Sequence, residues 1–432
     1  MIRALHFLVL WATAAGGGGR GPEWERPGAD SARVAALLAA LAHTDPVICD
    51  LIGDQLGNFW IGDDPARLGR FSDAPTRIQG AKDSLAGSVT DPRALTLLAA
   101  TLGTDNACVR RVAAKLLGRS AVSAAVLREL LADPSPRIRE SAAFAAGVGE
   151  RRDTRAALEH LLADTATGAA AMAGWALGEI HDPASAQALQ GAVHASSPRL
   201  RLASAWALGQ LEDASFVKDV LPLLRDPDPL MRATAAEALG RMKSPRVGAA
   251  LVGALTDRNT AVRRAAVSAL ADLHERSAVA ALEGLLLNDS DSEVQRECAR
   301  ALGELRAARS LEPLARALGD RDVEVQRAAA DAIAELEDVT KAPAALVRAT
   351  TSADPELRRN ATKSLARIGD PATLQALADR VGDEDKDIRL AAVEGLGEMK
   401  VAAAIPGLTR ALNDREPEVR RAAAEALGKT QE

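Results

Sequence analysis

Apolar and small residues return along this chain with the period of an α-helix, in a block that itself repeats. The last copy, Val419–Gly428, has the sequence VRRAAAEALG, and we call its first residue position 0. Positions 0, +3, +4, +7 and +8 are mostly apolar or small, which places them on one face of a helix. Position 0 recurs at Val109, Ile138, Ala169, Leu200, Met231, Val262, Val294, Val325, Leu357 and Ile388. Eleven copies, most of them 31 or 32 residues apart, predict tandem repeats of one structural unit.

Each copy carries the signals of a helix with defined ends. Position −3 is an Asn, Ser or Asp in nine copies, and these residue types cap helix N-termini; they are Asn106, Ser135, Ser197, Asp228, Asn259, Asp291, Asp322, Asp354 and Asp385. Position +9 is Gly in eight copies, where it bends the chain or lets a neighbour approach. Position +4 is Ala, Ser204 or Cys298 throughout, which predicts close helix packing. A shorter apolar segment, such as residues 249–255, precedes each copy. We therefore expect an all-α fold, an α-solenoid of two-helix repeats in which helix A precedes helix B.

A charged pair accompanies the apolar pattern. Position −5 is Asp in eight copies and position +1 is Arg in eight copies, as in Asp257 and Arg263. Such residues can bond within a repeat and to the next repeat. An exposed pair would contribute only about 0–1 kcal/mol, so its expected role is to set the stacking register.

Composition agrees with thin helical layers. Aromatic residues make up 2% of the chain and Ala dominates the 47% hydrophobic fraction, whereas a globular core of this size needs large side chains. The net charge of −6 argues against general nucleic-acid binding. The three cysteines, Cys49, Cys108 and Cys298, show no CxxC spacing, and we expect unpaired thiols.

The N-terminus has the features of an export signal. Arg3 precedes the apolar run 4–12, and Ala12-Thr13-Ala14 has the form of a cleavage site. The run is too short for a stable membrane span. We predict a signal peptide at 1–14, a flexible linker at 15–29, a divergent N-terminal cap with an irregular insertion at 30–104, and eleven repeats at 105–432. The expected location is periplasmic or secreted, with a cytoplasmic protein as the alternative.

The pattern D-x-x-x-x-V-R-x-x-A-A-x-A-L-G resembles the short HEAT-like repeats first described in phycobilin lyases. The resemblance covers about residues 105–430 and implies that B helices line a concave side. It implies a non-catalytic scaffold that binds another protein. The alternatives are a phycobilin-lyase-like chaperone or lyase, and a regulatory subunit of a neighbouring enzyme.

Candidate chemistry is sparse. Deoxyhypusine hydroxylases, the enzymes with a similar fold, need four His-Glu motifs, whereas this chain has one, His274-Glu275. The series Asp383-x-Asp385-x-Asp387 has Ile388 where a calcium loop needs Gly. We therefore expect no catalytic residues, no cofactor and no metal, and we assign Cys298 to the core.

Three aromatic residues are the first candidate partner site. Phe144, Trp175 and Trp206 occupy position +6 of successive copies, which should lie opposite the buried stripe, and Leu202 flanks them. Exposed Trp side chains often mark binding hot spots, so we predict that this stripe grips an apolar or extended partner segment. The alternative is that the rings pack on one another or are covered by the N-terminal insertion.

Four arginines at position +2 of consecutive copies are the second candidate, and they are Arg264, Arg296, Arg327 and Arg359. They could form a groove for an acidic segment of the partner. The alternative is a solvated face whose arginines pair with nearby Asp and Glu.

Overall fold

The computed structural model describes residues 29–42, 89–120 and 123–430, and the regular secondary structure in these ranges is helical. The all-α prediction is confirmed. The predicted signal peptide, the linker as far as residue 28, and residues 58–88 of the predicted insertion lie outside the described residues. The chain divides into two compact units, Met1–Leu211 and Glu212–Glu432, which are described separately below.

The B helices coincide with the eleven copies found in the sequence. In the first unit they are α5 (Ala107–Arg119), α7 (Pro136–Val148), α9 (Thr167–Ile180) and α11 (Pro198–Gln210). In the second unit they are α13 (Pro229–Arg241), α15 (Thr260–Asp272), α17 (Ser292–Glu304), α19 (Val323–Glu335), α21 (Pro355–Ile368), α23 (Lys386–Glu398) and α25 (Pro417–Lys429). Each helix begins at the residue after its predicted N-cap position.

The A helices are shorter, and several follow a single 3-10 turn. In the first unit they are α4 (Pro92–Thr101), α6 (Ala124–Leu131), α8 (Arg155–Leu161) and α10 (Ala186–Ala192), with η3 (Arg152–Thr154) and η4 (Pro183–Ser185). In the second unit they are α12 (Val217–Val220), α14 (Gly248–Ala254), α16 (Val279–Asn288), α18 (Leu311–Ala317), α20 (Ala344–Ala349), α22 (Leu374–Arg380) and α24 (Ile405–Ala411). Its 3-10 turns are η5 (Ala214–Phe216), η6 (Leu221–Arg225), η7 (Arg276–Ala278), η8 (Ala308–Ser310), η9 (Pro371–Thr373) and η10 (Ala402–Ala404). Helix α4 lies inside the predicted cap, so the first repeat begins before residue 105. Helix α2 (Ala29–Ala42) packs against α4 and α5.

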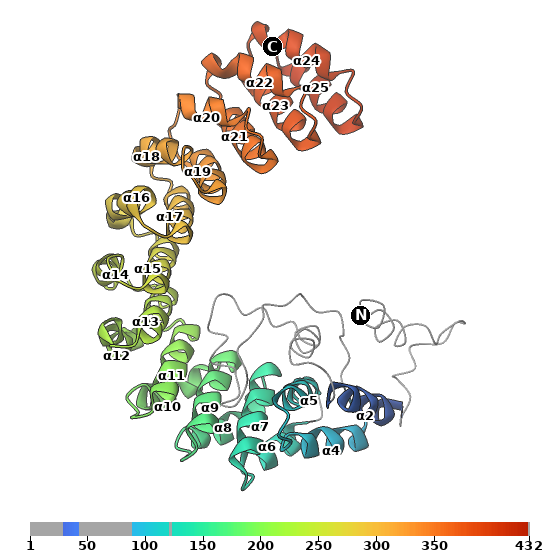
Figure 1. Ribbon diagram of the computed structural model, residues 1–432, viewed down its shortest axis with the longest axis vertical. Coiled ribbons are helices and arrows are strands. Elements are labelled where there is room, and N and C mark those ends of the chain that lie inside the picture. Colours follow the sequence, from blue (N-terminus) through green and yellow to red (C-terminus); the bar gives the residue numbers. More distant parts are fainter. Residues whose placement is uncertain (1–28, 43–88, 121–122, 431–432) are drawn as a thin grey trace. The chain divides into compact units, whose positions relative to one another are not determined.

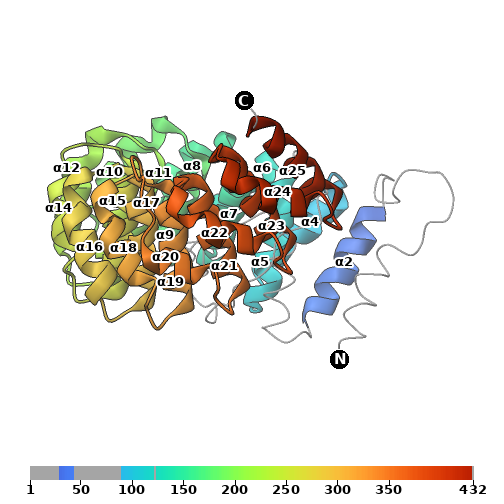
Figure 2. The same ribbon diagram turned by 90° about the horizontal axis from the view of Figure 1, so that it is seen from above.

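Within each unit the B helices pack side by side as one layer and each A helix packs on its own B helix. In the second unit α14, α16 and α18 form one row and α15, α17 and α19 the other (Figure 1; Figure 2). Position +4 of the B helix is fully buried in all eleven copies, as its small side chains predicted. One apolar residue of each A helix is equally buried: Leu98, Leu127, Leu158, Leu189, Val220, Leu251, Leu282, Leu314, Leu346, Leu377 and Leu408. The core is therefore a column shared between repeats, and no repeat has a core of its own.

The predicted N-caps form with one exception. Eight of the nine capping side chains accept a backbone N–H of the first helical turn, and Ser135 does not. Asp385, for example, accepts from Asp387 and Ile388. The helix starts therefore depend on local side-chain bonds as well as on packing.

The turn after the B helix has a backbone shape that the sequence did not signal. Position +12 is left-handed in eight copies, and only one of these residues is glycine, Gly369. The others have φ between 47° and 52° and are Glu150, His181, Glu212, Lys243, His274, Arg306 and Lys400. This is the position after a helix where glycine is usual, so each of the seven costs roughly 1 kcal/mol of backbone strain.

Candidate partner-binding surfaces

Position +6 of the B helix is buried in the first unit. The exposed fraction is 3% for Lys115, 4% for Phe144, 1% for Trp175 and 7% for Trp206. Leu202, the predicted flanking residue, is buried as well. The prediction that these side chains lie opposite the buried stripe is therefore wrong, and the three aromatic residues belong to the interior of this unit.

Two contacts cover part of these rings. The rings of Phe144 and Trp175 stack, with centroids 5.4 Å apart and planes inclined by 17°. Each tryptophan also lies over the position +9 glycine of the preceding B helix. A Cβ atom on Gly147 would lie 2.6 Å from a ring carbon of Trp175, and one on Gly178 would lie 2.5 Å from Trp206. The absent side chain of the glycine therefore makes room for the ring of the next repeat.

The same position faces solvent in the second unit. It is half-buried at Glu237 and exposed in every later copy, at Ser268, Arg300, Asp331, Lys363, Glu394 and Glu425. These residues carry both signs of charge and include no aromatic side chain. The exposed position +6 that was expected for the aromatic residues is therefore found on the B helices of residues 212–432 instead.

The Arg–Asp pairs form a ladder between consecutive repeats. In five places the Arg at position +1 donates Nε and Nη2 to the Asp at position −5 of the next repeat, over 2.5–3.3 Å. The pairs of this Arg–Asp ladder are Arg139–Asp164, Arg232–Asp257, Arg263–Asp289, Arg358–Asp383 and Arg389–Asp414. The Nη1 group of each Arg donates to a backbone carbonyl of its own repeat, as from Arg389 to Asp383 at 3.0 Å. The predicted bonding within and between repeats is confirmed.

The ladder pairs are more buried than the sequence suggested. No side chain in the five pairs is more than 16% exposed. The hydrogen bond from Arg389 lowers the pKa of Asp414, and Arg139 and Arg232 lower the pKa of Asp164 and Asp257 in the same way. The contribution to stability expected of an exposed pair is therefore too small for a pair of this ladder. Removal of one partner would leave a charge with little access to water.

Each arginine at position +2 lies close to at least one carboxylate. Arg264 approaches Glu293 at 3.9 Å, and Arg296 contacts Glu293 at 2.6 Å. Arg327 donates Nε and Nη2 to Asp354, and Arg359 donates Nη2 to Asp385, both at the N-cap of the next B helix. These side chains are between 23% and 31% exposed. An acidic partner would have to compete with these carboxylates.

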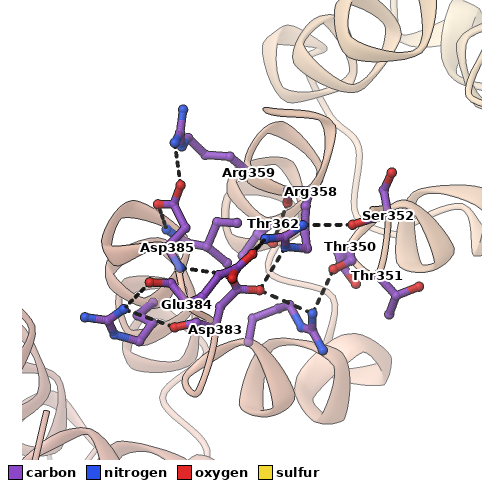
Figure 3. A network of polar contacts seen from close by, with 12 residues as sticks. Thr350, Thr351, Ser352, Arg358, Arg359, Thr362, Asp383, Glu384 and Asp385 are labelled. Carbon is purple, nitrogen blue, oxygen red and sulfur yellow. Dashed lines mark hydrogen bonds and ion pairs between the residues drawn. The ribbon is translucent and has the colours of Figure 1, made fainter. Parts of the chain in front are cut away.

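Figure 3 shows the network of polar contacts at the junction between α21 and α23. Arg358 donates to the carboxylates of Asp383 and Glu384 and to the carbonyl oxygen of Ser352. Arg380 donates to the carbonyl oxygen of Thr350 at 3.1 Å and to Asp383 at 3.4 Å. The Asp383 and Asp385 carboxylates are thus occupied by capping and ladder bonds, which explains the acidic series without a calcium ion.

The preceding junction, between α19 and α21, lacks both ladder residues. Gln326 stands at position +1 and Ser352 at position −5 of the next repeat. A cavity of about 650 Å³ opens there, and Gln326, Ser352, Arg316 and Arg348 all contribute to its lining. The prediction from sequence missed this cavity, although the paired departures from the Arg and Asp pattern were visible signals for it.

The remaining candidate residues have structural partners. Cys298 is a fully buried free thiol at position +4, and its burial raises the pKa of the thiol, so its assignment to the core is confirmed. Cys108, half-exposed in the first turn of α5, is disulfide-bonded, so the expectation of an unpaired thiol is wrong there. His274 is a left-handed turn residue and Glu275 caps η7 by accepting from Ser277. In the described ranges no three His, Cys, Asp or Glu side chains are grouped to hold a metal ion. None of the helices in those ranges has the length and apolar character needed to cross a bilayer.

Comparison with known proteins identifies the repeat type. Residues 123–199, 189–270, 249–324, 314–389 and 379–432 each match the family of HEAT repeats. Together these matches cover well over half of the chain. No curated protein is significantly similar in sequence.

Several solved structures are similar in fold. Kap95p, from a nuclear import study with RanGDP, has 13% identity and a TM-score of 0.50, over 92% of this chain and 58% of that one. An engineered protein has 21% identity and a TM-score of 0.47, over 78% of this chain and 99% of that one. The CpcE–CpcF phycocyanin lyase of Nostoc has 22% identity and a TM-score of 0.34, over 57% of this chain and 93% of that one. The likeness to Kap95p, at 13% identity, extends to the fold alone.

Proposed function

Because this chain belongs to the HEAT-repeat family, we propose that it is a non-catalytic scaffold that binds another protein along the B helices of residues 212–432. The partner lies across several repeats and contacts positions +2 and +6 of successive helices. No cofactor or metal takes part, and nucleic acid is not the partner.

The exposed position +6 row carries this proposal. Within the second unit positions 0, +4 and +7 of the B helices are buried, so position +6 is free to vary without loss of the core. It holds Arg300 and Lys363 among the acidic residues Asp331, Glu394 and Glu425. A face of mixed charge selects a partner by complementary charges, which contribute more to specificity and association rate than to raw affinity.

The arginines at position +2 refine the nature of the partner. Arg327 and Arg359 are already bonded to Asp354 and Asp385, so an acidic segment gains only by sharing them. We expect such a segment to contact the exposed edge of these pairs, and its binding to weaken as salt concentration rises.

Site-specific photo-cross-linking in the native host tests the proposal. A photoreactive amino acid replaces Ser268 or Glu394 at position +6, and Ala280, exposed on α16, is the matched control. One protein should be cross-linked from both B-helix sites and not from Ala280. With that protein purified, Lys363→Glu should weaken its binding about tenfold, equivalent to about 1.4 kcal/mol. Adducts confined to Ala280, or none at either B-helix site, would contradict the proposal.

We also propose that the protein is exported to the periplasm or the medium. The Arg3-led apolar segment supports this, and so does the disulfide of Cys108, since disulfides persist mainly in oxidising compartments. Expression of the full chain followed by N-terminal sequencing should show cleavage near Ala14. An uncleaved protein in the cytoplasm with a reduced Cys108 would contradict export.

A further inference from the structure

The cavity between α18 and α20 has largely apolar walls. Its volume is about 650 Å³, within the range of sites that bind small ligands or peptide side chains. Ala315, Leu318, Pro343, Ala349 and Leu357 give it apolar walls. Such walls suit an aliphatic or aromatic group.

The cavity lies where the Arg–Asp ladder is interrupted. Gln326 donates Nε2 to the carbonyl oxygen of Asp320 at 2.6 Å, so it reproduces the bond that a ladder Arg makes within its own repeat. It is too short to reach the next repeat as well. Ser352 places no carboxylate where the other junctions have Asp. The two side chains at this junction are therefore smaller than a guanidinium–carboxylate pair.

Stacking of the two repeats is maintained one position along the helix. Arg327 donates Nε to Asp354 at 2.9 Å and Nη2 to its other oxygen at 2.5 Å. This bidentate pair has the geometry of a ladder pair but joins positions +2 and −3. The interruption at Gln326 and Ser352 thus does not separate the repeats.

Two arginines that line the cavity lack the partners that other arginines of this unit have. Arg316 on α18 and Arg348 on α20 are exposed, and their guanidinium groups make no hydrogen bond or ion pair within the residues described. Glu312 also lines the cavity, so the three charged side chains leave it with a positive balance. Guanidinium groups bind carboxylates through parallel N–H donors, often in a bidentate manner.

We propose that this cavity is a docking site for an acidic segment of the partner protein, in which an apolar residue precedes an Asp or Glu. The apolar side chain packs against Leu318 and Leu357, and the carboxylate accepts hydrogen bonds from Arg316 and Arg348. The proposal rests on the proposed scaffold function and deepens it. It adds a second contact for the acidic segment, on the A helices α18 and α20, to the one proposed at the position +2 arginines.

Titration of the full chain with a short peptide tests this site directly. The probe is the capped peptide acetyl-Gly-Leu-Glu-Leu-Gly-amide, and the control has Gln in place of Glu. Isothermal titration at low salt should show millimolar or tighter binding of the acidic peptide and at least tenfold weaker binding of the control. Arg316→Gln with Arg348→Gln should reduce binding at least tenfold, while Arg300→Gln, on the exposed face of α17, should leave it unchanged.

A ladder-restoring variant provides the second test. Gln326→Arg with Ser352→Asp recreates the pair found at five other junctions and fills the cavity. Peptide binding should fall at least tenfold while the thermal midpoint is kept or raised.

Three results would overturn the docking site: no binding of the acidic peptide, equal binding of both peptides, or unchanged binding by the ladder-restoring variant. Cross-linking from Ser268 and Glu394 is independent of the cavity, so it separates failure of this site from failure of the scaffold proposal.

Discussion

The side chain at position +6 of the B helix is buried in the first unit and exposed in the second. At position +6, Trp175 is 1% exposed in the first unit, whereas Lys363 is exposed in the second. The two units share N-caps, the buried small residue at +4 and the buried apolar residue of the A helix. The residues at +6 themselves differ, because the first unit has three aromatic residues and a lysine there, whereas the second has polar and charged residues. In the first unit a ring at +6 meets a glycine at +9 of the preceding helix, which allows close contact.

Replacement of the buried ring should have the largest effect of any change at this position. Trp175→Ala should destabilise the first unit by about 3–5 kcal/mol, because it removes the ring that stacks on Phe144 and lies against Gly147. Ser268→Ala, at the same position in the second unit, should change stability by less than about 0.5 kcal/mol. Hydrogen exchange measured by mass spectrometry can follow each unit separately. Similar effects of the two substitutions would remove the distinction between the units.

Removal of a ladder arginine should have the next largest effect. Arg389→Gln should destabilise the repeats around α23 by about 2–4 kcal/mol, since Asp414 keeps its charge in a site that water barely reaches. Arg420 holds the same repeat position but donates only to carbonyl oxygens and is exposed. Its replacement by Gln should cost less than about 1 kcal/mol. Urea unfolding followed by local hydrogen exchange measures both values, and equal costs would contradict a specific role for the buried ladder.

Acid should weaken the pair that replaces the ladder at the cavity. The hydrogen bond from Arg327 lowers the pKa of Asp354 to about 2, below the ordinary value of 3.8. The stabilisation by this pair is therefore complete above about pH 4 and is lost as the pH falls through the folded pKa. Thermal midpoints of the parent and Arg327→Gln proteins should differ most near pH 6, approach each other as the pH falls towards 2, and converge below it. A gap that stays constant with pH would show that the charge on Asp354 is not involved.

Relief of backbone strain should have the smallest effect. His274 is held at φ 51° after α15, and His274→Gly should stabilise the second unit by roughly 0.5–1 kcal/mol. Gly369 already occupies the equivalent turn after α21, so Gly369→Ala should destabilise by a similar amount. Thermal unfolding of the two variants checks the signs, and a loss of stability for His274→Gly would contradict the strain.

The frame of the fold was predictable from sequence because it depends on residue types within one repeat. N-cap residues, the small residue at +4 and the Arg–Asp spacing each act locally or on the next repeat, so periodicity revealed them. Packing of the rings on one another was predicted only as the alternative, and the stack of Phe144 on Trp175 confirms it. The contact with glycine was not predictable from one helix, because a helical wheel does not include the glycine of the neighbouring helix. Gly147 and Trp175, for example, lie in different repeats.

Other features were missed for equally physical reasons. The left-handed turn at +12 carries Glu, His, Lys or Arg in place of glycine in most copies, so its conformation left no residue signature. The cavity is lined by Gln326 and Ser352, which depart from the ladder pattern in two repeats and come together only when the repeats stack. The disulfide of Cys108 was likewise not predictable, because the cysteines show no spacing motif.

Amine acylation of the native protein tests most directly whether position +6 is buried in the first unit and exposed in the second, because a lysine occupies this position in each unit. Lys115 is 3% exposed in the first unit and Lys363 is exposed in the second. Under single-hit conditions, with the site of modification read by mass spectrometry, Lys363 should react at least tenfold faster than Lys115, and the difference should vanish in denaturant. Equal rates in the native protein would contradict the account and with it the placement of the partner-binding face in residues 212–432.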